Sequence, residues 1–127
     1  MMRLKDLDYT LDAAKENMGI GLYVVAAFYL HLAVEKALKA TIISLKNKTP
    51  AKTHRLQRLY SEIADKVLLT EKQVEFLEEL TPVATKARYA DIEFVAPSEI
   101  YTKELVQEYM EKALPIIKKL KTCIQEK

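Results

Sequence analysis

The longest run of apolar positions in the chain lies between Ile20 and Lys46 and has the periodicity of a buried helix. No proline interrupts this stretch, and no glycine occurs in it after Gly21. Apolar side chains occupy nearly the whole circumference of a helix drawn through it, and such helices are covered by several neighbours. The pattern therefore predicts a central helix over 20–46, roughly 39 Å long at a rise of about 1.5 Å per residue.

One row of ionisable side chains breaks the apolar surface of this expected helix. His31, Glu35 and Lys39 recur every four residues and share one face, with Lys36 beside them. One interpretation is an ion-pair row on an amphipathic helix, in which Glu35 and Lys39 have the favourable order and contribute about 0.2–0.5 kcal/mol. The others are a polar pocket, with His31 hydrogen-bonded and Lys39 ready to bind phosphate, and polar packing in a dimer interface.

Helical periodicity also precedes and follows the central helix. Residues 3–17 form a first helix, which ends at Asn17-Met18-Gly19 because asparagine and glycine suit the left-handed position after a helix. After a polar loop over 47–52, Thr53 is the expected N-cap of a third helix that continues to Val67.

Two more helices complete the expected set. Thr70 and Gln73 have the spacing of a capping box and open a fourth helix. Its pattern continues to Ala87, with a kink or a split at Pro82. After a loop over 88–97, Ser98 or Thr102 caps the last helix.

Composition agrees with this all-helical pattern. The chain has 127 residues, of which 50% are hydrophobic, with two glycines and four prolines. This balance excludes disorder and suits one compact core. We therefore expect a single all-α domain over 1–127, an antiparallel up-and-down bundle of four to five helices.

Two features predict a cytoplasmic location without membrane contact. The apolar run that begins at Ile20 ends before Glu35, which is short of the ~20 residues that a bilayer needs. Cys123 is the single cysteine and has no internal disulfide partner, as is usual in a reducing compartment. Two histidines and one cysteine without ligand spacing predict no metal site, and no cofactor is expected.

Basic residues are concentrated in one part of the chain, although the net charge is only +2. Residues 36–58 contain seven basic side chains and no acid. They are Lys36, Lys39, Lys46, Lys48, Lys52, Arg55 and Arg58. One interpretation is a solvated loop and helix start. The other is a contact with RNA or a nucleotide, made by side chains because the sequence has no glycine-rich phosphate loop.

Four short motifs occur in a fixed order along the chain: FYLHLAVEKALKA over 28–40, TH-x-L over 53–56, the pair Arg88-Tyr89, and Tyr101-Thr102 before the last helix. Together they resemble the HEPN domain family over nearly the whole sequence. The resemblance implies a helical bundle that is often dimeric and is associated with nucleotide or RNA binding. It also implies, as a partner, a minimal nucleotidyltransferase in a toxin–antitoxin pair.

Many members of this family are metal-independent ribonucleases with a motif of arginine, four to six residues, then histidine. Arg88 matches the arginine, but positions 93, 94 and 95 hold Glu93, Phe94 and Val95. The resemblance therefore favours a binding module without chemistry of its own. One alternative is a ribonuclease that uses Arg88 with a substitute base such as Glu93 or His31. Another is a non-catalytic structural homo-oligomer.

The expected nucleotide or RNA contacts combine the polar row, the basic segment and the family motifs. They are His31, Glu35, Lys36, Lys39, Lys52, His54, Arg55, Arg58, Arg88 and Tyr89, with Arg88 as the one catalytic candidate. Two of them have a simpler interpretation. Arg88 can cap the fourth helix and pair with a nearby acid, and His54 can be an ordinary residue at a helix start.

Overall fold

A computed structural model of the chain describes residues 4–84 and 97–125. Every regular element within these two ranges is a helix. The helices are α1 (Leu4–Gly19), α2 (Tyr23–Lys46), α3 (Leu56–Ser61), α4 (Glu71–Leu80), α6 (Pro97–Ile100) and α7 (Lys103–Gln125). The all-α bundle predicted from the sequence is confirmed.

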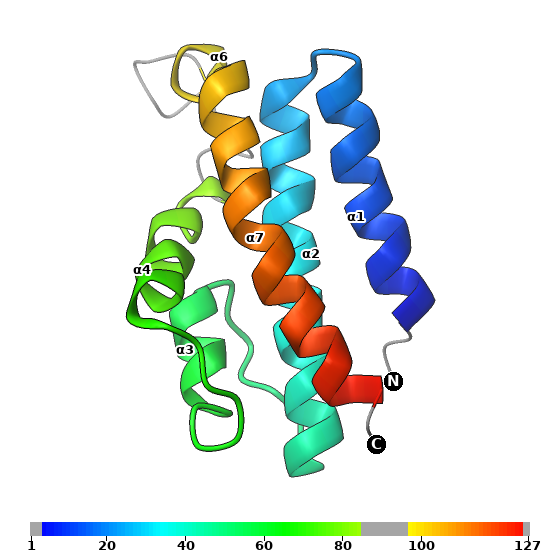
Figure 1. Ribbon diagram of the computed structural model, residues 1–127, viewed down its shortest axis with the longest axis vertical. Helices are drawn as coiled ribbons and strands as arrows, with labels where there is room; N and C mark the ends of the chain where they lie inside the picture. The colour runs from blue at the N-terminus through cyan, green and yellow to red at the C-terminus, as the bar shows by residue number, and fades with distance from the viewer. Residues whose placement is uncertain (1–3, 85–96, 126–127) are drawn as a thin grey trace.

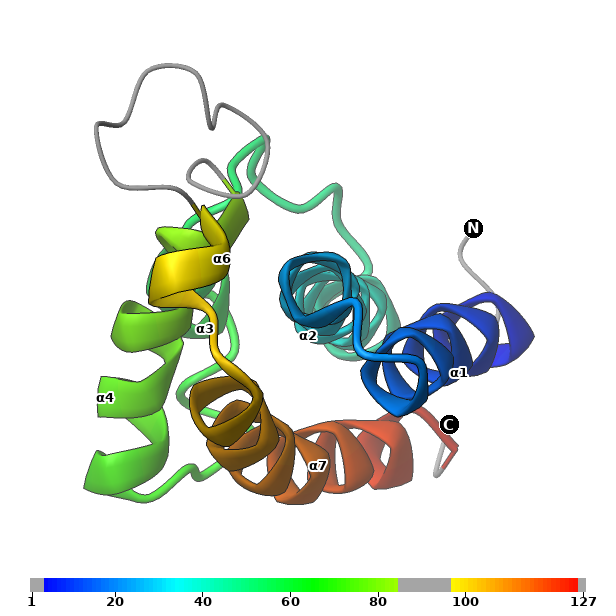
Figure 2. The same cartoon turned by 90° about the horizontal axis from the view of Figure 1, so that it is seen from above.

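The helix α2 lies at the centre of the bundle (Figures 1 and 2). It packs along α1 and α7, and its C-terminal half also contacts α3. A short turn joins α1 to α2, so these two helices are antiparallel. The helix α7 runs in the same direction as α2, because the chain returns through α4 before α7 begins (Figure 1).

The turn between the first two helices depends on backbone conformations that glycine adopts easily. Helix α1 ends at Gly19, and Gly21 has a φ of +84°, where a side chain would be strained. The N–H of Leu22 donates to the carbonyl of Asn17 at 2.9 Å and closes the turn. Helix α2 consequently starts at Tyr23, three residues later than the apolar pattern indicates.

Helix α3 is shorter than predicted. It covers Leu56–Ser61 instead of continuing from Thr53 to Val67, and Arg55 occupies the N-cap position. The physical reason lies at Tyr60, whose hydroxyl donates to the carbonyl of Val67 at 2.6 Å and accepts from the N–H of Leu69 at 3.0 Å. These bonds hold the chain in turns, which still bury Val67 without a continuous helix.

Helix α4 begins as predicted, and the expected split at Pro82 is confirmed, because Thr81 and Pro82 form a turn and the chain is helical again at Val83 and Ala84. The capping box is confirmed, since Thr70 Oγ1 accepts from the N–H of Gln73 and the Gln73 side chain accepts from the N–H of Thr70. The helix ends at Leu80, two residues before Pro82, which has no N–H to continue it. The predicted continuation to Ala87 lies largely outside the described residues, as does the predicted loop up to position 96.

The last helix starts after Thr102, one of the two residues expected to cap it. Thr102 Oγ1 accepts from the N–H of Leu105 at 3.3 Å, whereas Ser98 falls inside the short helix α6. Helix α7 then continues through Pro115, which lies on its exposed side. None of the helices in the described parts of the chain is both long enough and apolar enough to cross a membrane.

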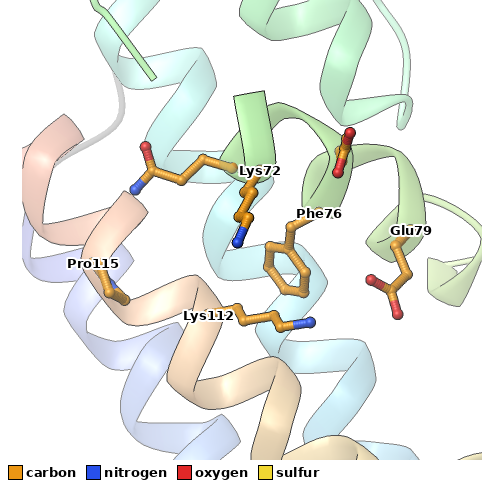
Figure 3. A pocket seen from close by; sticks show the side chains of 7 residues that line it. Lys72, Phe76, Glu79, Lys112 and Pro115 are labelled. Carbon is orange, nitrogen blue, oxygen red and sulfur yellow. The ribbon is translucent and has the colours of Figure 1, made fainter. Parts of the chain in front are cut away.

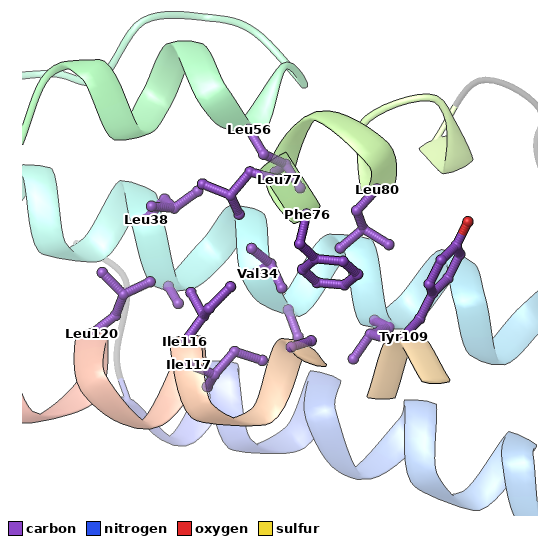
Figure 4. Packing of buried hydrophobic residues seen from close by; sticks show 14 of the residues in the cluster. Val34, Leu38, Leu56, Phe76, Leu77, Leu80, Tyr109, Ile116, Ile117 and Leu120 are labelled. Carbon is purple, nitrogen blue, oxygen red and sulfur yellow. The ribbon is translucent and has the colours of Figure 1, made fainter. Parts of the chain in front are cut away.

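The core fills the space between α2 and the helices around it (Figure 4). Side chains from α2, α3, α4 and α7 meet there, and an edge-to-face pair of Phe76 and Tyr109 closes one side with ring centroids 5.8 Å apart. The labelled members are Val34, Leu38, Leu56, Phe76, Leu77, Leu80, Tyr109, Ile116, Ile117 and Leu120. This packing fixes one side of α2 and thereby positions the polar row on its other side.

We expect replacement of Leu38 by alanine to lower the free energy of unfolding by about 2–5 kcal/mol, because it opens a cavity in this core. Leu38 is 0% exposed, whereas Leu68 is 78% exposed, so Leu68→Ala is a matched control with an effect within about 0.5 kcal/mol. Urea denaturation of both variants at equal protein concentration measures the difference. Equal destabilisation by the two substitutions would contradict the core described above.

Candidate functional site

Glu35 is the centre of a polar cluster on α2. Only 5% of the residue is exposed, and both carboxylate oxygens accept hydrogen bonds from basic side chains. Oε1 accepts from His54 Nδ1 at 2.9 Å, and Oε2 accepts from Lys39 Nζ at 3.0 Å. The carboxylate therefore connects α2 to the segment that precedes α3.

His31 makes a second connection to the same segment. It lies one turn before Glu35, is 2% exposed, and places Nε2 3.1 Å from the backbone carbonyl of His54. A carbonyl oxygen only accepts, so Nε2 carries the proton. In the neutral ring, Nδ1 then has a lone pair, and it lies 3.7 Å from Glu35 Oε1.

His54 is held at both its backbone and its ring, yet the ring remains accessible. Its carbonyl accepts from His31, its Nδ1 donates to Glu35, and 65% of its side chain is exposed. The other ring nitrogen, Nε2, has no hydrogen-bond partner among the described residues. The cluster thus presents one fixed imidazole nitrogen to solvent.

The environment of the cluster shifts the pKa of two of its members. Burial pushes the pKa of Glu35 upward, but the hydrogen bonds from His54 and Lys39 outweigh burial and hold that pKa below its ordinary value. Burial also lowers the pKa of His31, more strongly than the nearby carboxylate raises it. Near neutral pH, Glu35 is therefore ionised and His31 is neutral.

The basic segment is less uniformly charged in space than in sequence. Lys46 pairs with Asp65 at 2.7 Å and Lys48 pairs with Glu62 at 2.8 Å, so acids from beyond position 58 neutralise two of its cations. Lys36 donates to the hydroxyl of Thr10 at 2.8 Å, and Lys39 is paired with Glu35.

Three exposed cations of the segment remain without an ion pair in the described residues. Lys52, Arg55 and Arg58 form no side-chain hydrogen bond or ion pair within the described residues. They lie within four residues of His54 in the chain. Together with Lys39 and His54 they form what we call the His54 surface.

The remaining sequence candidates fall into two groups. His31 and Glu35 are buried beneath the His54 surface, and Lys36 points to Thr10 on α1. Arg88 and Tyr89 lie outside the described residues, as do Glu93, Phe94 and Val95. The structure therefore brings together His31, Glu35, Lys39 and His54, and the arginine of the family motif is not placed relative to them.

The described parts of the chain do not cover the central helix all round. One face of its N-terminal half carries Val25, Phe28 and Leu32, and Val25 is 38% exposed. The adjoining turn exposes Ile20 and Leu22 as well. Apolar side chains grouped in this way are typical of protein–protein contacts.

A pocket between α4 and α7 lies apart from the His54 surface (Figure 3). Phe76 lines it together with side chains of both charges, including Lys72, Glu79 and Lys112. None of the candidates predicted from the sequence lines this pocket. Within residues 4–84 and 97–125, no group of three or more histidine, cysteine or acidic side chains is arranged to hold a metal ion.

Comparison with known proteins supports the resemblance seen in the motifs. The family model described as HEPN domain matches residues 4–123. The chain belongs to the HEPN domain family. Its fold is also similar to the crystal structure of TT1696 from Thermus thermophilus, with a TM-score of 0.82 and 25% sequence identity over 94% of each chain. Nothing matches in a comparison with curated proteins.

The sequence pattern of this HEPN domain did not indicate that His54 binds to Glu35 of the polar row. It indicated mainly a residue at a helix start for His54, and it placed the polar row on α2 alone. The contact between His54 and Glu35 joins positions 19 apart across a loop without periodicity. The one available signal was the TH-x-L motif, whose histidine supplies both the ring and the carbonyl.

We expect the HEPN domain to lose stability as the pH falls below 6.5, the ordinary pKa of histidine, in part because of His31. The folded-state pKa of His31 is lower, so below pH 6.5 the unfolded chain takes up a proton that the folded chain does not. His31→Gln keeps an N–H donor for the His54 carbonyl and does not titrate. It should flatten the decline between pH 6.5 and 5, measured as urea midpoints at a series of pH values. A variant that declines as steeply as the wild type would show that His31 titrates alike in both states.

Proposed function

We propose that this HEPN protein binds a phosphate-bearing ligand, RNA or a nucleotide, at the His54 surface. The observation that carries the proposal is the buried Glu35, which fixes the exposed imidazole of His54, in a segment whose nearby exposed cations form no ion pair within the described residues. A carboxylate with so little exposure requires donors around it. Here two of those donors come from side chains that reach the surface.

The chemistry of this surface suits phosphate groups. Lys52, Arg55 and Arg58 supply positive charge, and arginine binds phosphate oxygens through two N–H groups at once. Binding of this kind depends on charge and on ordinary side chains, without a glycine-rich loop. Affinity should consequently fall as salt concentration rises.

We also propose that the protein acts as a homodimer. The exposed apolar side chains of Ile20, Leu22 and Val25, at the start of α2 and in the turn before it, support this, since a second copy would cover them. HEPN domains often dimerise. The family resemblance implies an alternative partner for this face, a minimal nucleotidyltransferase in a toxin–antitoxin pair. A cytoplasmic location fits either partner.

Ribonuclease activity is the second candidate function, and one observation favours it. Glu35 holds the ring of His54 through Nδ1 and leaves Nε2 accessible, which is how a carboxylate orients a histidine base. His54 would then replace His31 as the substitute base, because the ring of His31 is buried and engaged. Incubation with RNA, beside His54→Ala, distinguishes cleavage from binding alone.

We expect Lys52→Ala to weaken RNA binding at all sequences tested and to reduce the salt slope by about one phosphate contact. Lys5→Ala is the matched control, because Lys5 is also exposed but lies on α1. Gel retardation of a labelled RNA at two salt concentrations measures both effects. Equal losses in the two variants would point to a diffuse charge effect and contradict a defined surface.

We expect Val25→Glu to convert a dimer into a folded monomer, because it places a charge in the proposed contact without disturbing the core. Leu68→Glu adds the same charge at a position that is 78% exposed and lies between α3 and α4, and it should leave the dimer intact. Analytical ultracentrifugation gives the mass and circular dichroism the helix content. A wild-type protein that stays monomeric at high concentration would remove the dimer from the proposal.

A further inference from the structure

We infer that ligand binding at the His54 surface is coupled to protonation of His54. In the bound state, the imidazolium ring bridges two anions, with Nδ1–H donating to Glu35 and Nε2–H donating to a phosphate oxygen of the ligand. This inference rests on the proposed function. It goes further by making the site pH-dependent, since the affinity for the ligand would then rise with proton concentration.

The hydrogen-bond partners of the His54 ring decide how many protons it carries. The ionised Glu35 carboxylate only accepts, so the 2.9 Å contact places the proton of a neutral His54 ring on Nδ1. Nε2 then has a lone pair and repels a phosphate oxygen, which is also only an acceptor at the diester. A ring between two acceptors needs a proton on each nitrogen. The contact with phosphate therefore requires uptake of one proton.

The second carboxylate oxygen of Glu35, Oε2, supports the placement of the proton on His54 Nδ1. Lys39 donates to Oε2 at 3.0 Å, and this bond keeps the carboxylate ionised and fixes its orientation. Rotation of Glu35 away from His54 would break the bond to Lys39 as well. The ring therefore has no simple way to move its proton from Nδ1 to Nε2 while it stays neutral and bound to Glu35.

The charges around His54 allow the extra proton. On α2, Glu35 favours a positive ring, whereas Lys39 opposes it and His31 stays neutral because burial lowers its pKa. On the segment of His54 itself, the cations Lys52 and Arg55 oppose a further positive charge until an anion arrives. The ligand supplies that anion, which is why binding and protonation should favour each other.

Linkage fixes the size of the effect. One proton taken up with one ligand makes affinity rise by up to about tenfold for each unit fall in pH, over the range where the free ring is neutral and the bound ring is charged. Histidine changes charge between pH 5 and 8, so the effect falls in an accessible range.

The experiment uses a 2′-O-methyl RNA oligonucleotide with a fluorescent label and no terminal phosphate. Its phosphodiesters keep their charge between pH 5.5 and 8.5, and it has no 2′-hydroxyl for a cleavage reaction. Fluorescence anisotropy at constant ionic strength gives the dissociation constant of the full chain at each pH. ¹⁵N NMR of the two histidine rings at pH 7.5 reports whether ligand addition protonates His54.

Three proteins make the comparison. The wild type should bind several-fold more tightly at pH 6 than at pH 8, and its His54 ring should gain a proton on binding. His54→Gln keeps a neutral N–H donor but does not titrate, and it should bind with little dependence on pH. His31→Gln is the matched control, because it changes the buried histidine of the same cluster, and it should keep the dependence of the wild type.

Each contrary result is distinct. Salt-sensitive binding that does not change with pH would overturn the inference and leave the proposed function standing. A full pH dependence in His54→Gln would overturn it as well, since another group would then take up the proton. Absence of binding at every pH and at low salt would remove the proposed function and the inference with it.

Discussion

The buried carboxylate of Glu35 is the constraint on which the organisation of this surface depends. An ionised carboxylate away from water is costly unless hydrogen bonds and opposite charges surround it. In this HEPN domain the donors are Lys39, one turn further along α2, and His54, from a segment without regular structure. The hydrogen bond from His54 to Glu35 Oε1 therefore fixes the path of the chain before α3. A second bond, from His31 to the carbonyl of His54, holds the same segment.

The same helix serves the core and the surface on different faces. Residues such as Val34 and Leu38 pack α2 against α7 and the start of α3. The core therefore also holds the polar row of His31, Glu35 and Lys39 in position. Sites built on rigid elements hold side chains more precisely than sites on loops. His54 obtains the same advantage although it lies on a loop, because two bonds tie it to α2.

Periodicity predicted the helices and caps that depend on local, repeating features. It failed for helix ends and contacts that depend on a single side chain. The long α2 helix and the capping box at Thr70 follow from patterns within a few residues. Helix α3 is short because the hydroxyl of Tyr60 bridges Val67 and Leu69, a contact that no helical period encodes. The pairing of Lys46 with Asp65 likewise comes from folding, and it removes charge that the sequence counted as free. The fold was thus largely predictable, whereas the site was predictable only as a set of residue types.

The polar row on α2 had two principal interpretations, an ion-pair row and a pocket lining, and the structure contains the ion pair of the first and the hydrogen-bonded His31 that the second expected. The Glu35–Lys39 pair is the expected helical ion pair, but pairs of this kind stabilise an exposed helix only slightly. Glu35 is instead buried, where an apolar side chain of similar size would cover the same surface without the cost of removing charge from water. Stability alone therefore does not explain a carboxylate at this position. What distinguishes it from an apolar residue is its ability to accept from His54, so we attribute the buried charge to the accessible imidazole that it holds.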